Sequence, residues 1–256
     1  MYEEREEQEF IDLEQEEREL TDEAILAMMF VIATTKENVE KELRNFYQKY
    51  GKDGVVTYAE ARKWVSEQNH QRRLTALLLF LGGEFAIAQD KLETHFRTFL
   101  TSIVDKESTF FGVKVDVTDV LNKPWGIDEL RWLDRLEADV NLWKATIAKD
   151  IKQAMHRGAS LDDVLTQLEK RFGSIDKVLE KLGLTESTAV GSLSRYEIFK
   201  EMGITKYQFF TKPDERRCEE CGALHGKIFP ISAFEVGVTA SPIHPHCRCW
   251  EVPIDD

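Results

Sequence analysis

All four cysteines of this 256-residue chain lie between positions 218 and 249, and they form two close pairs. Cys218 and Cys221 form a C-x-x-C motif, and Cys247 and Cys249 form a C-x-C motif. The preceding 217 residues contain no cysteine, so the clustering of the four thiols needs a common cause. Two such pairs are typical of a tetrahedral zinc site that ties a small segment of chain together. We therefore expect one zinc ion to clamp a C-terminal module.

Two histidines, His244 and His246, precede the second cysteine pair and add to the candidate ligands. The four cysteines would complete a closed four-sulfur shell, which is the arrangement we favour. His244 is the alternative ligand and could replace one of the cysteines. No signal peptide is visible, so we expect a reducing compartment, where a thiolate–metal site is favoured over disulfides. Two disulfides or free buried thiols are the interpretations without a metal.

A closed four-ligand shell indicates a structural zinc, because a catalytic zinc keeps one position open and works with a general base. The sequence lacks the H-x-E motif of zinc deaminases, the H-E-x-x-H helix of metalloproteases, the P-loop and the dinucleotide fingerprint. The enzymatic alternative is a metal-dependent nuclease of the HNH type, in which His225 or His244 would be the general base. We expect no enzymatic activity.

Acidic residues are concentrated at the N-terminus. Of the net charge of -13, residues 1–23 contribute -10, from twelve acidic and two basic residues. We expect residues 1–20 to be an acidic tail, either a frayed helix or a disordered segment. The alternative is an arm that docks on a basic surface of a partner. No apolar run is long enough to span a bilayer, so we expect no membrane segment.

Hydrophobic periodicity predicts an N-terminal helical region over residues 21–107. Thr21 is the predicted N-cap of its first helix, which ends at Gly51–Gly54. A capping-box pattern at Thr57–Glu60 predicts a second helix to about Ile103, with a kink or break at Gly82–Gly83. The β-prone residues that follow predict a linker or short strand over residues 108–124.

Helical periodicity returns over residues 125–203. One apolar stripe predicts a helix that ends near Gly158, and Ser160 is the predicted N-cap of the next. Gly173–Ser174 and Gly183 predict the ends of short helices. Thr185 is expected to begin the last helix, which closes at Gly203.

Residues 204–256 are expected to form the zinc-binding, β-containing module, because Pro213, Pro230, Pro242 and Pro245 make regular helix unfavourable there. Tyr207–Thr211, Ile228–Phe229 and Cys249–Val252 are the predicted strands. The expected fold class is thus mainly α, a helical body with a small C-terminal α+β module clamped by zinc.

The C-terminal half carries a series of motifs in a specific order. They are Thr185-Glu186-Ser187, Gly203-Ile204-Thr205-Lys206-Tyr207, Asp214 with Arg217-Cys218, Cys221, Gly226-Lys227-Ile228-Phe229 and His244-Pro245-His246-Cys247-Arg248-Cys249. In order and spacing, residues 125 to 253 resemble the C-terminal domain of the phage head morphogenesis proteins, the Mu F-like minor head protein family.

The resemblance implies a structural minor capsid protein of a tailed phage or prophage, which acts in head assembly near the portal and in genome delivery. Its implied partners are the portal protein and other capsid proteins. Its implied location is the virion, in the capsid interior or portal region, and the host cytoplasm during assembly. The rival functions are an intracellular zinc-binding adaptor or regulator and the metal-dependent nuclease.

Weak contact with DNA is a further expectation for a protein inside a head. The residues that could touch phosphate are Lys212, Arg216, Arg217, Lys227 and Arg248. From Arg195 onward, however, eight basic residues face ten acidic ones, whereas binding through counterion release needs a net basic face. We therefore favour a role for Arg217 and Arg248 in stabilising the thiolates.

Overall fold

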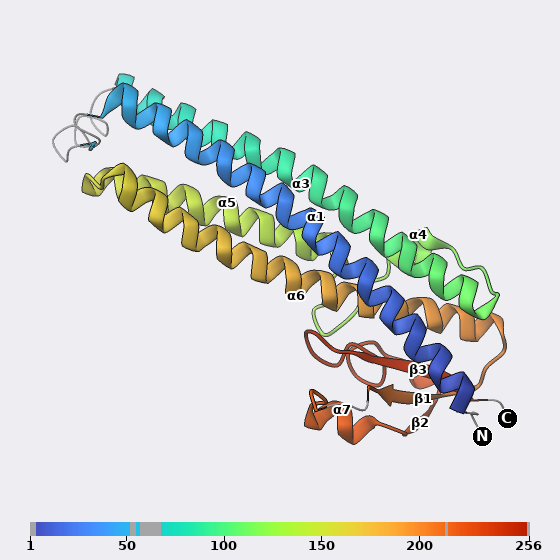
Figure 1. Cartoon of the computed structure of the whole chain (residues 1–256). Coiled ribbons are helices and arrows are strands. Elements are labelled where there is room, and N and C mark those ends of the chain that lie inside the picture. The colour runs from blue at the N-terminus through green and yellow to red at the C-terminus, as the bar shows by residue number, and fades with distance from the viewer. Residues whose placement is uncertain (1–3, 52–54, 57–67, 213–214, 255–256) are drawn as a thin grey trace. The chain divides into compact units, whose positions relative to one another are not determined.

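The computed structural model describes residues 4–51, 55–56, 68–212 and 215–254, and Figure 1 shows the chain. These residues are mainly α-helical and end in a three-stranded antiparallel sheet, which confirms the expected fold class. The helices are α1 (Glu4–Tyr50), α3 (Gln68–Phe111), α4 (Val117–Leu121), α5 (Trp132–Arg157), α6 (Leu161–Glu201) and α7 (Glu219–Leu224). The strands are β1 (Lys206–Thr211), β2 (Ile228–Pro230) and β3 (Cys249–Ile254). No helix among the described residues combines the length and the hydropathy needed to cross a bilayer.

The chain divides into two compact units, each built from separate stretches of sequence. The first unit comprises Met1–Leu26, His95–Arg135 and Glu180–Asp256. The second comprises Ala27–Thr94 and Leu136–Leu179. Helices α1, α3, α5 and α6 contribute residues to both units.

The second unit is helical among its described residues, and its core is formed by the apolar stripes of four helical segments. Phe85 of α3 stacks on Phe172 of α6, with ring centroids 6.3 Å apart. Asn38 of α1 donates a hydrogen bond of 2.8 Å to the carboxylate of Glu84 on α3. The hydroxyl of Tyr47 donates to the backbone carbonyl of Ala159 at 3.2 Å. Polar bonds therefore accompany the apolar packing that the periodicity predicted.

The acidic N-terminal stretch is part of α1, and the N-cap predicted at Thr21 is wrong. Thr21 is buried inside the helix, and its hydroxyl donates to the carbonyl of Glu17 at 2.7 Å. Phe10 and Leu13 are also buried, so the apolar stripe extends back to the first described turns. The stripe is hard to see in the sequence because two of its positions, Glu17 and Thr21, are polar.

The strand considered for residues 108–124 is absent from this part of the structure. Helix α3 continues to Phe111, and the short helix α4 follows. The carboxylate of Asp116 caps α4 by accepting hydrogen bonds from the backbone N–H groups of Thr118 and Asp119, at 2.7 and 3.1 Å. The β-prone valines Val115 and Val120 are buried, so their pattern reflects packing rather than a strand.

Helix α6 is one continuous helix, so the breaks predicted at Gly173–Ser174 and Gly183 and the start at Thr185 are wrong. The hydroxyls of Ser174 and Thr185 instead donate to the carbonyls four residues earlier. The N-cap at Ser160 is confirmed, because its hydroxyl accepts a bond from the N–H of Asp163.

The glycine stops are partly confirmed. Gly158 and Gly203 follow helices with φ of 69° and 73°, and α1 ends immediately before Gly51. Gly82–Gly83, in contrast, lies within the continuous helix α3. The capping box expected at Thr57–Glu60 lies outside the described residues.

The sheet has the order β2-β1-β3, and all three strands were predicted (Figure 1). β1 pairs with β2 from Lys206↔Pro230 to Gln208↔Ile228, and with β3 from Lys206↔Ile254 to Thr211↔Cys249. Tyr207, Phe209 and Thr211 alternate as the buried face of β1. The pairing of Thr211 with Cys249 places one cysteine of the second pair at the end of the central strand.

The continuity of α6 predicts that Gly173→Ala stabilises the protein. A Cβ at Gly173 would meet no atom within 4 Å, and alanine loses less backbone entropy in a helix than glycine. We expect the free energy of unfolding to rise by about 0.5–1 kcal/mol in urea titrations.

The matched control is Gly203→Ala. Its left-handed φ of 73° disfavours a side chain, so we expect a loss of about 1–2 kcal/mol. A loss of stability in Gly173→Ala would show that α6 is interrupted at that position.

Candidate metal site

The first cysteine pair is shaped by the start of helix α7. Cys218 is the N-cap of this helix, and its sulfur accepts a hydrogen bond of 3.3 Å from the backbone N–H of Cys221. The N–H of Gly222 in turn donates to the carbonyl of Cys218 at 2.9 Å. Gly222 lies inside α7 and is not among the positive-φ glycines. The turn therefore does not need glycine's conformational freedom.

The second half of the site comes from the segment that leads into β3. His246 adopts a left-handed conformation with φ of 61°, and it turns the chain between His244 and Cys247. Cys247 and Cys249 are buried, whereas His246 is exposed. The thiols of Cys221, Cys247 and Cys249 pack in one cluster with Phe209 of β1.

The donor atoms of five residues converge. The Nε2 atom of His244 lies 3.1 Å from the sulfur of Cys218 and 3.2 Å from that of Cys221. The sulfurs of Cys221 and Cys247 are 3.7 Å apart. Two thiolates bound to one tetrahedral zinc at about 2.3 Å each are separated by about 3.8 Å. The spacing and the soft donor set therefore fit a metal ion.

The donors form two overlapping groups that share Cys221. Cys218, Cys221 and His244 make the first group, and Cys221, Cys247 and Cys249 make the second, with all donor atoms of a group within 4.8 Å of one another. The structure thus brings together the four cysteines and His244, and both the four-cysteine shell and a shell with His244 remain available. His246 and His225 belong to neither group.

His225 has a different environment. Its Nδ1 accepts a bond of 3.3 Å from the backbone N–H of Thr211, and its ring meets the edge of the Phe210 ring, with centroids 5.0 Å apart. Nδ1 of His225 is therefore used in a hydrogen bond with the backbone of β1.

The protein environment favours deprotonation of one thiol. Partial burial raises the pKa of Cys218, but the hydrogen bonds from Cys221 and the proximity of His244 outweigh that effect, so the pKa lies below its ordinary value. Metal ligation requires the thiolate form, so the local bonds act in the same direction as a bound cation.

Basic side chains surround this cluster. Lys212, Arg216, Arg217 and Arg248 line a shallow hollow together with Cys218, Cys221, Cys249, His244 and His246. Lys212 also pairs with Glu14 of α1 at 2.9 Å. Lys227, the fifth basic residue considered for phosphate contact, does not line the hollow. Arg217 and Arg248 thus lie beside the thiols, and their role in stabilising thiolates stays a prediction.

A buried ion cluster lies behind β3 and holds this strand in place. Arg195 of α6 contacts three carboxylates: Glu107 of α3, Glu17 of α1 at 3.6 Å and Glu251 of β3 at 3.5 Å. Glu107 and Glu251 are completely buried, and Arg195 is 3 % exposed. Gly191 lies against the cluster, since a Cβ there would be in ordinary van der Waals contact with Glu107 Oε1 at 3.4 Å.

Hydrogen bonds extend this cluster toward the cysteines. Glu251 accepts bonds from the hydroxyl of Ser192 at 2.9 Å and from the backbone N–H of Ser241 at 2.6 Å. The hydroxyl of Thr188, one turn earlier on α6, donates to the carbonyl of Cys247 at 3.1 Å. Helix α6 therefore positions the segment that carries the second cysteine pair.

Burial dominates the titration of the cluster. It raises the pKa of Glu17 well above its ordinary value, and the nearby carboxylate of Glu107 raises it further against the effect of Arg195. The pKa values of Glu107 and Glu251 are also raised, again chiefly by burial. The adjacent carboxylates of Glu17 and Glu107 thus favour the binding of a proton, which reduces the excess of negative charge around one guanidinium.

Sequence reasoning missed these supporting residues. One of them has a local signal, because Glu251 is a charged residue within an otherwise apolar stretch, between Trp250 and Val252. None of the cluster residues belongs to the motifs quoted above; of the buried charged residues that the structure describes in this unit, only Glu186 does.

Glu186 anchors the loop before α5 to α6. Its carboxylate accepts a bond of 2.9 Å from the indole N–H of Trp125 and one of 3.1 Å from Arg135. The guanidinium of Arg135 also lies 4.2 Å from the centre of the Trp125 ring. Burial raises the pKa of Glu186 to about 7. This residue is therefore a packing element of the first unit.

One comparison with known families gave a match. Residues 145–252 match the model of the family described as Phage Mu protein F like protein. The matched segment begins within α5 and includes α6, both cysteine pairs and most of β3. It confirms the Mu F-like resemblance of the C-terminal half. Searches of curated proteins and of solved structures found no match.

The shared position of Cys221 predicts that this residue is indispensable for metal binding. We expect elemental analysis of the purified chain to find about one zinc per chain, and Cys221→Ala to lose it. His244→Ala and Cys249→Ala then identify the fourth ligand. The variant that keeps the metal has lost a residue that is not a ligand, so the other residue is the ligand.

The matched control is His225→Ala, which changes a histidine of the same module outside both donor groups. It should keep the full metal content. Metal-free protein with four titratable thiols would refute the site.

The raised pKa of Glu17 predicts that stability falls as pH rises. The folded state binds a proton that the unfolded state has already released, so this contribution is complete below the unfolded-state pKa of 4.5 and is lost as pH passes the folded-state pKa. Glu17→Gln keeps a hydrogen-bond donor toward Glu107 without the charge. We expect Glu17→Gln to be more stable than the parent by at least about 1 kcal/mol near pH 8, and this difference to disappear near pH 5.

Urea titrations across this pH range measure the effect. Glu19→Gln, an exposed position on the same helix, should follow the parent at every pH. If Glu17→Gln were less stable than the parent at high pH, Glu17 would be an ionised partner of Arg195 instead.

Proposed function

We propose that this chain is a structural minor head protein of a tailed phage or prophage, which acts in head assembly near the portal. The observation that carries the proposal is the Mu F-like match over residues 145–252, which encloses the complete donor cluster. A relation to phage head morphogenesis proteins follows from the family. The minor capsid role, the place near the portal and a part in genome delivery are the finer steps that we propose.

The geometry of the donor cluster supports a structural use of the metal. A zinc ion held there would tie the start of α7 to the segment before β3, and so close the module around Phe209. The five available donors suffice to fill a tetrahedral shell, and His225 is engaged by the backbone of β1. We therefore propose a non-enzymatic protein with a zinc clamp.

The proposed partners are the portal protein and other capsid proteins. The proposed location is the head interior or portal region of the virion. DNA contact is at most weak in this proposal, because the basic hollow also contains the donor cluster and Lys212 is paired with Glu14.

The proposal predicts that the chain is a stoichiometric component of heads. In the phage or prophage that carries the gene, quantitative mass spectrometry of purified procapsids should find it at a few copies per head. Deletion should leave heads that fail in assembly or DNA delivery, and cryo-EM maps of procapsids with and without the chain should differ near the portal.

Complementation links this role to the clamp. Cys221→Ala should fail to restore infectious heads, while His225→Ala should restore them. A chain that is absent from purified heads, or whose deletion leaves infectivity intact, would overturn the proposal and favour the zinc-binding adaptor.

A further inference from the structure

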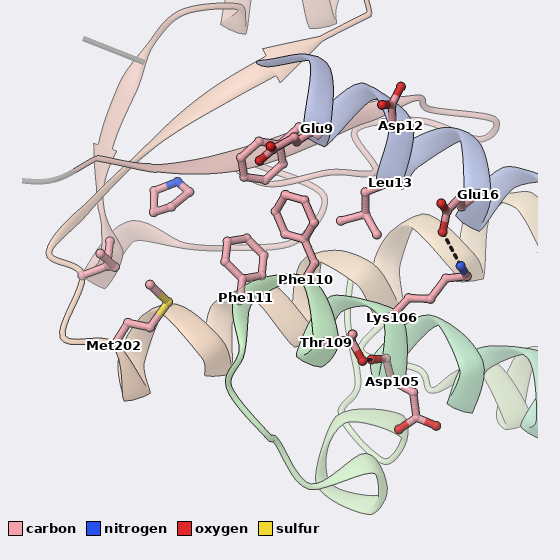
Figure 2. Close-up of a pocket in the computed structure, with 13 residues that line it drawn as sticks. Glu9, Asp12, Leu13, Glu16, Asp105, Lys106, Thr109, Phe110, Phe111 and Met202 are labelled. Carbon is pink, nitrogen blue, oxygen red and sulfur yellow. Dashed lines mark hydrogen bonds and ion pairs between the residues drawn. The ribbon is translucent and has the colours of Figure 1, made fainter. Parts of the chain in front are cut away.

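A groove with an apolar floor lies in the first unit, where the first turns of α1 meet the end of α3 (Figure 2). Its volume is about 740 Å³. Phe110 and Phe111 form the floor with Phe10, whose ring centroid lies 4.8 Å from that of Phe110 and 5.8 Å from that of Phe111. Phe110 and Phe111 are only half-buried, and Met202 at the edge is 44 % exposed. Apolar side chains that line a hollow and stay accessible are typical of binding grooves.

The rim of this groove is acidic. Glu9, Asp12 and Glu16 project from α1, and Asp105 comes from α3 (Figure 2). The single basic residue of the lining, Lys106, pairs with Glu16. Four carboxylates against one ammonium give the groove a net negative charge.

The spacing of the rim carboxylates concentrates this charge on one face of α1. Residues three and four apart on a helix are neighbours, so Asp12 lies next to both Glu9 and Glu16. Like charges at such spacing destabilise a helix by about 0.2–0.5 kcal/mol per pair. The chain thus keeps a row of like charges beside half-buried aromatic rings, so an acidic rim and an apolar floor lie side by side.

We propose that this groove binds a short amphipathic segment of a partner protein whose apolar side chains are flanked by lysine or arginine. The apolar residues would cover Phe110, Phe111 and Met202, and the cationic residues would meet the carboxylates of the rim. Burial of apolar area supplies the affinity, and the charges select the partner and its orientation. The groove volume falls within the range of about 300–1,000 Å³ that specific sites occupy. This surface lies apart from the cysteine cluster, and the inference holds whatever assembly the chain joins.

The test uses the full-length, metal-loaded chain and a synthetic probe. The probe is a fluorescein-labelled peptide of leucine and lysine, arranged so that one helical face is apolar. Two reference peptides replace its lysines by glutamate or its leucines by serine. We expect saturable binding of the leucine–lysine peptide alone in fluorescence anisotropy, weakened by salt because the rim charges are exposed.

Charge-reversal variants localise the binding. Glu9→Lys combined with Asp12→Lys changes two exposed rim residues and should weaken binding about tenfold at low salt. The matched control combines Glu19→Lys with Glu23→Lys, two exposed residues on the same helix outside the groove lining. It changes the net charge by the same amount and should leave the affinity within about twofold of the parent. Met202→Glu should also weaken binding of the leucine–lysine peptide. Circular dichroism checks that each variant is folded.

Three outcomes overturn the proposal. Equal loss in both double variants would mean that the peptide responds only to the net charge of the chain. Binding of the serine–lysine peptide as tight as that of the leucine–lysine peptide would mean that the apolar floor takes no part. A groove-dependent dimer in sedimentation that excludes the peptide would make a second copy of the chain the occupant.

Discussion

The contact of Arg195 with three carboxylates, two of them completely buried, ties together parts of the chain that are far apart in sequence. Glu17 comes from α1, Glu107 from α3 and Glu251 from β3, while Arg195 belongs to α6. A buried charge is costly to leave unpaired, so each of these elements must be in place for the others to be tolerated. The ion cluster therefore specifies how the sheet module sits against the helix ends of its own unit.

The metal site depends on this arrangement. Glu251 lies two residues after Cys249 and fixes Ser241 through its backbone N–H, and Thr188 holds the carbonyl of Cys247. These contacts with α6 position β3 and the segment before it, and so place the second cysteine pair next to the first. A zinc ion at the cluster would hold the same segment a second time, because it would link the second cysteine pair to Cys218 and Cys221.

Much of this arrangement could be predicted from residue type and spacing. The three strands, the helix stops at Gly158 and Gly203 and the convergence of the cysteines with His244 follow from local signals. The length of α1 and α6 could not be read in the same way. Glu17 and Thr21 lie on the inward face of α1. Because both are polar, the helical spacing of apolar residues is interrupted at these two positions. Gly173 and Gly183 are tolerated inside α6, because helix packing outweighs the weak intrinsic preference of single residues.

Long-range pairing is the part that local patterns do not contain. Phe10 packs in one cluster with Trp250 and Val252, residues from almost opposite ends of the sequence. During synthesis the first turns of α1 leave the ribosome long before β3 exists, so Phe10 can meet Phe110 of α3 well before Trp250 and Val252 are made. The helical unit in the middle of the chain can form earlier, since its last residue is Leu179. The first unit also needs residues that follow Leu179, so it can be completed only after the sequence of the second unit has been synthesised.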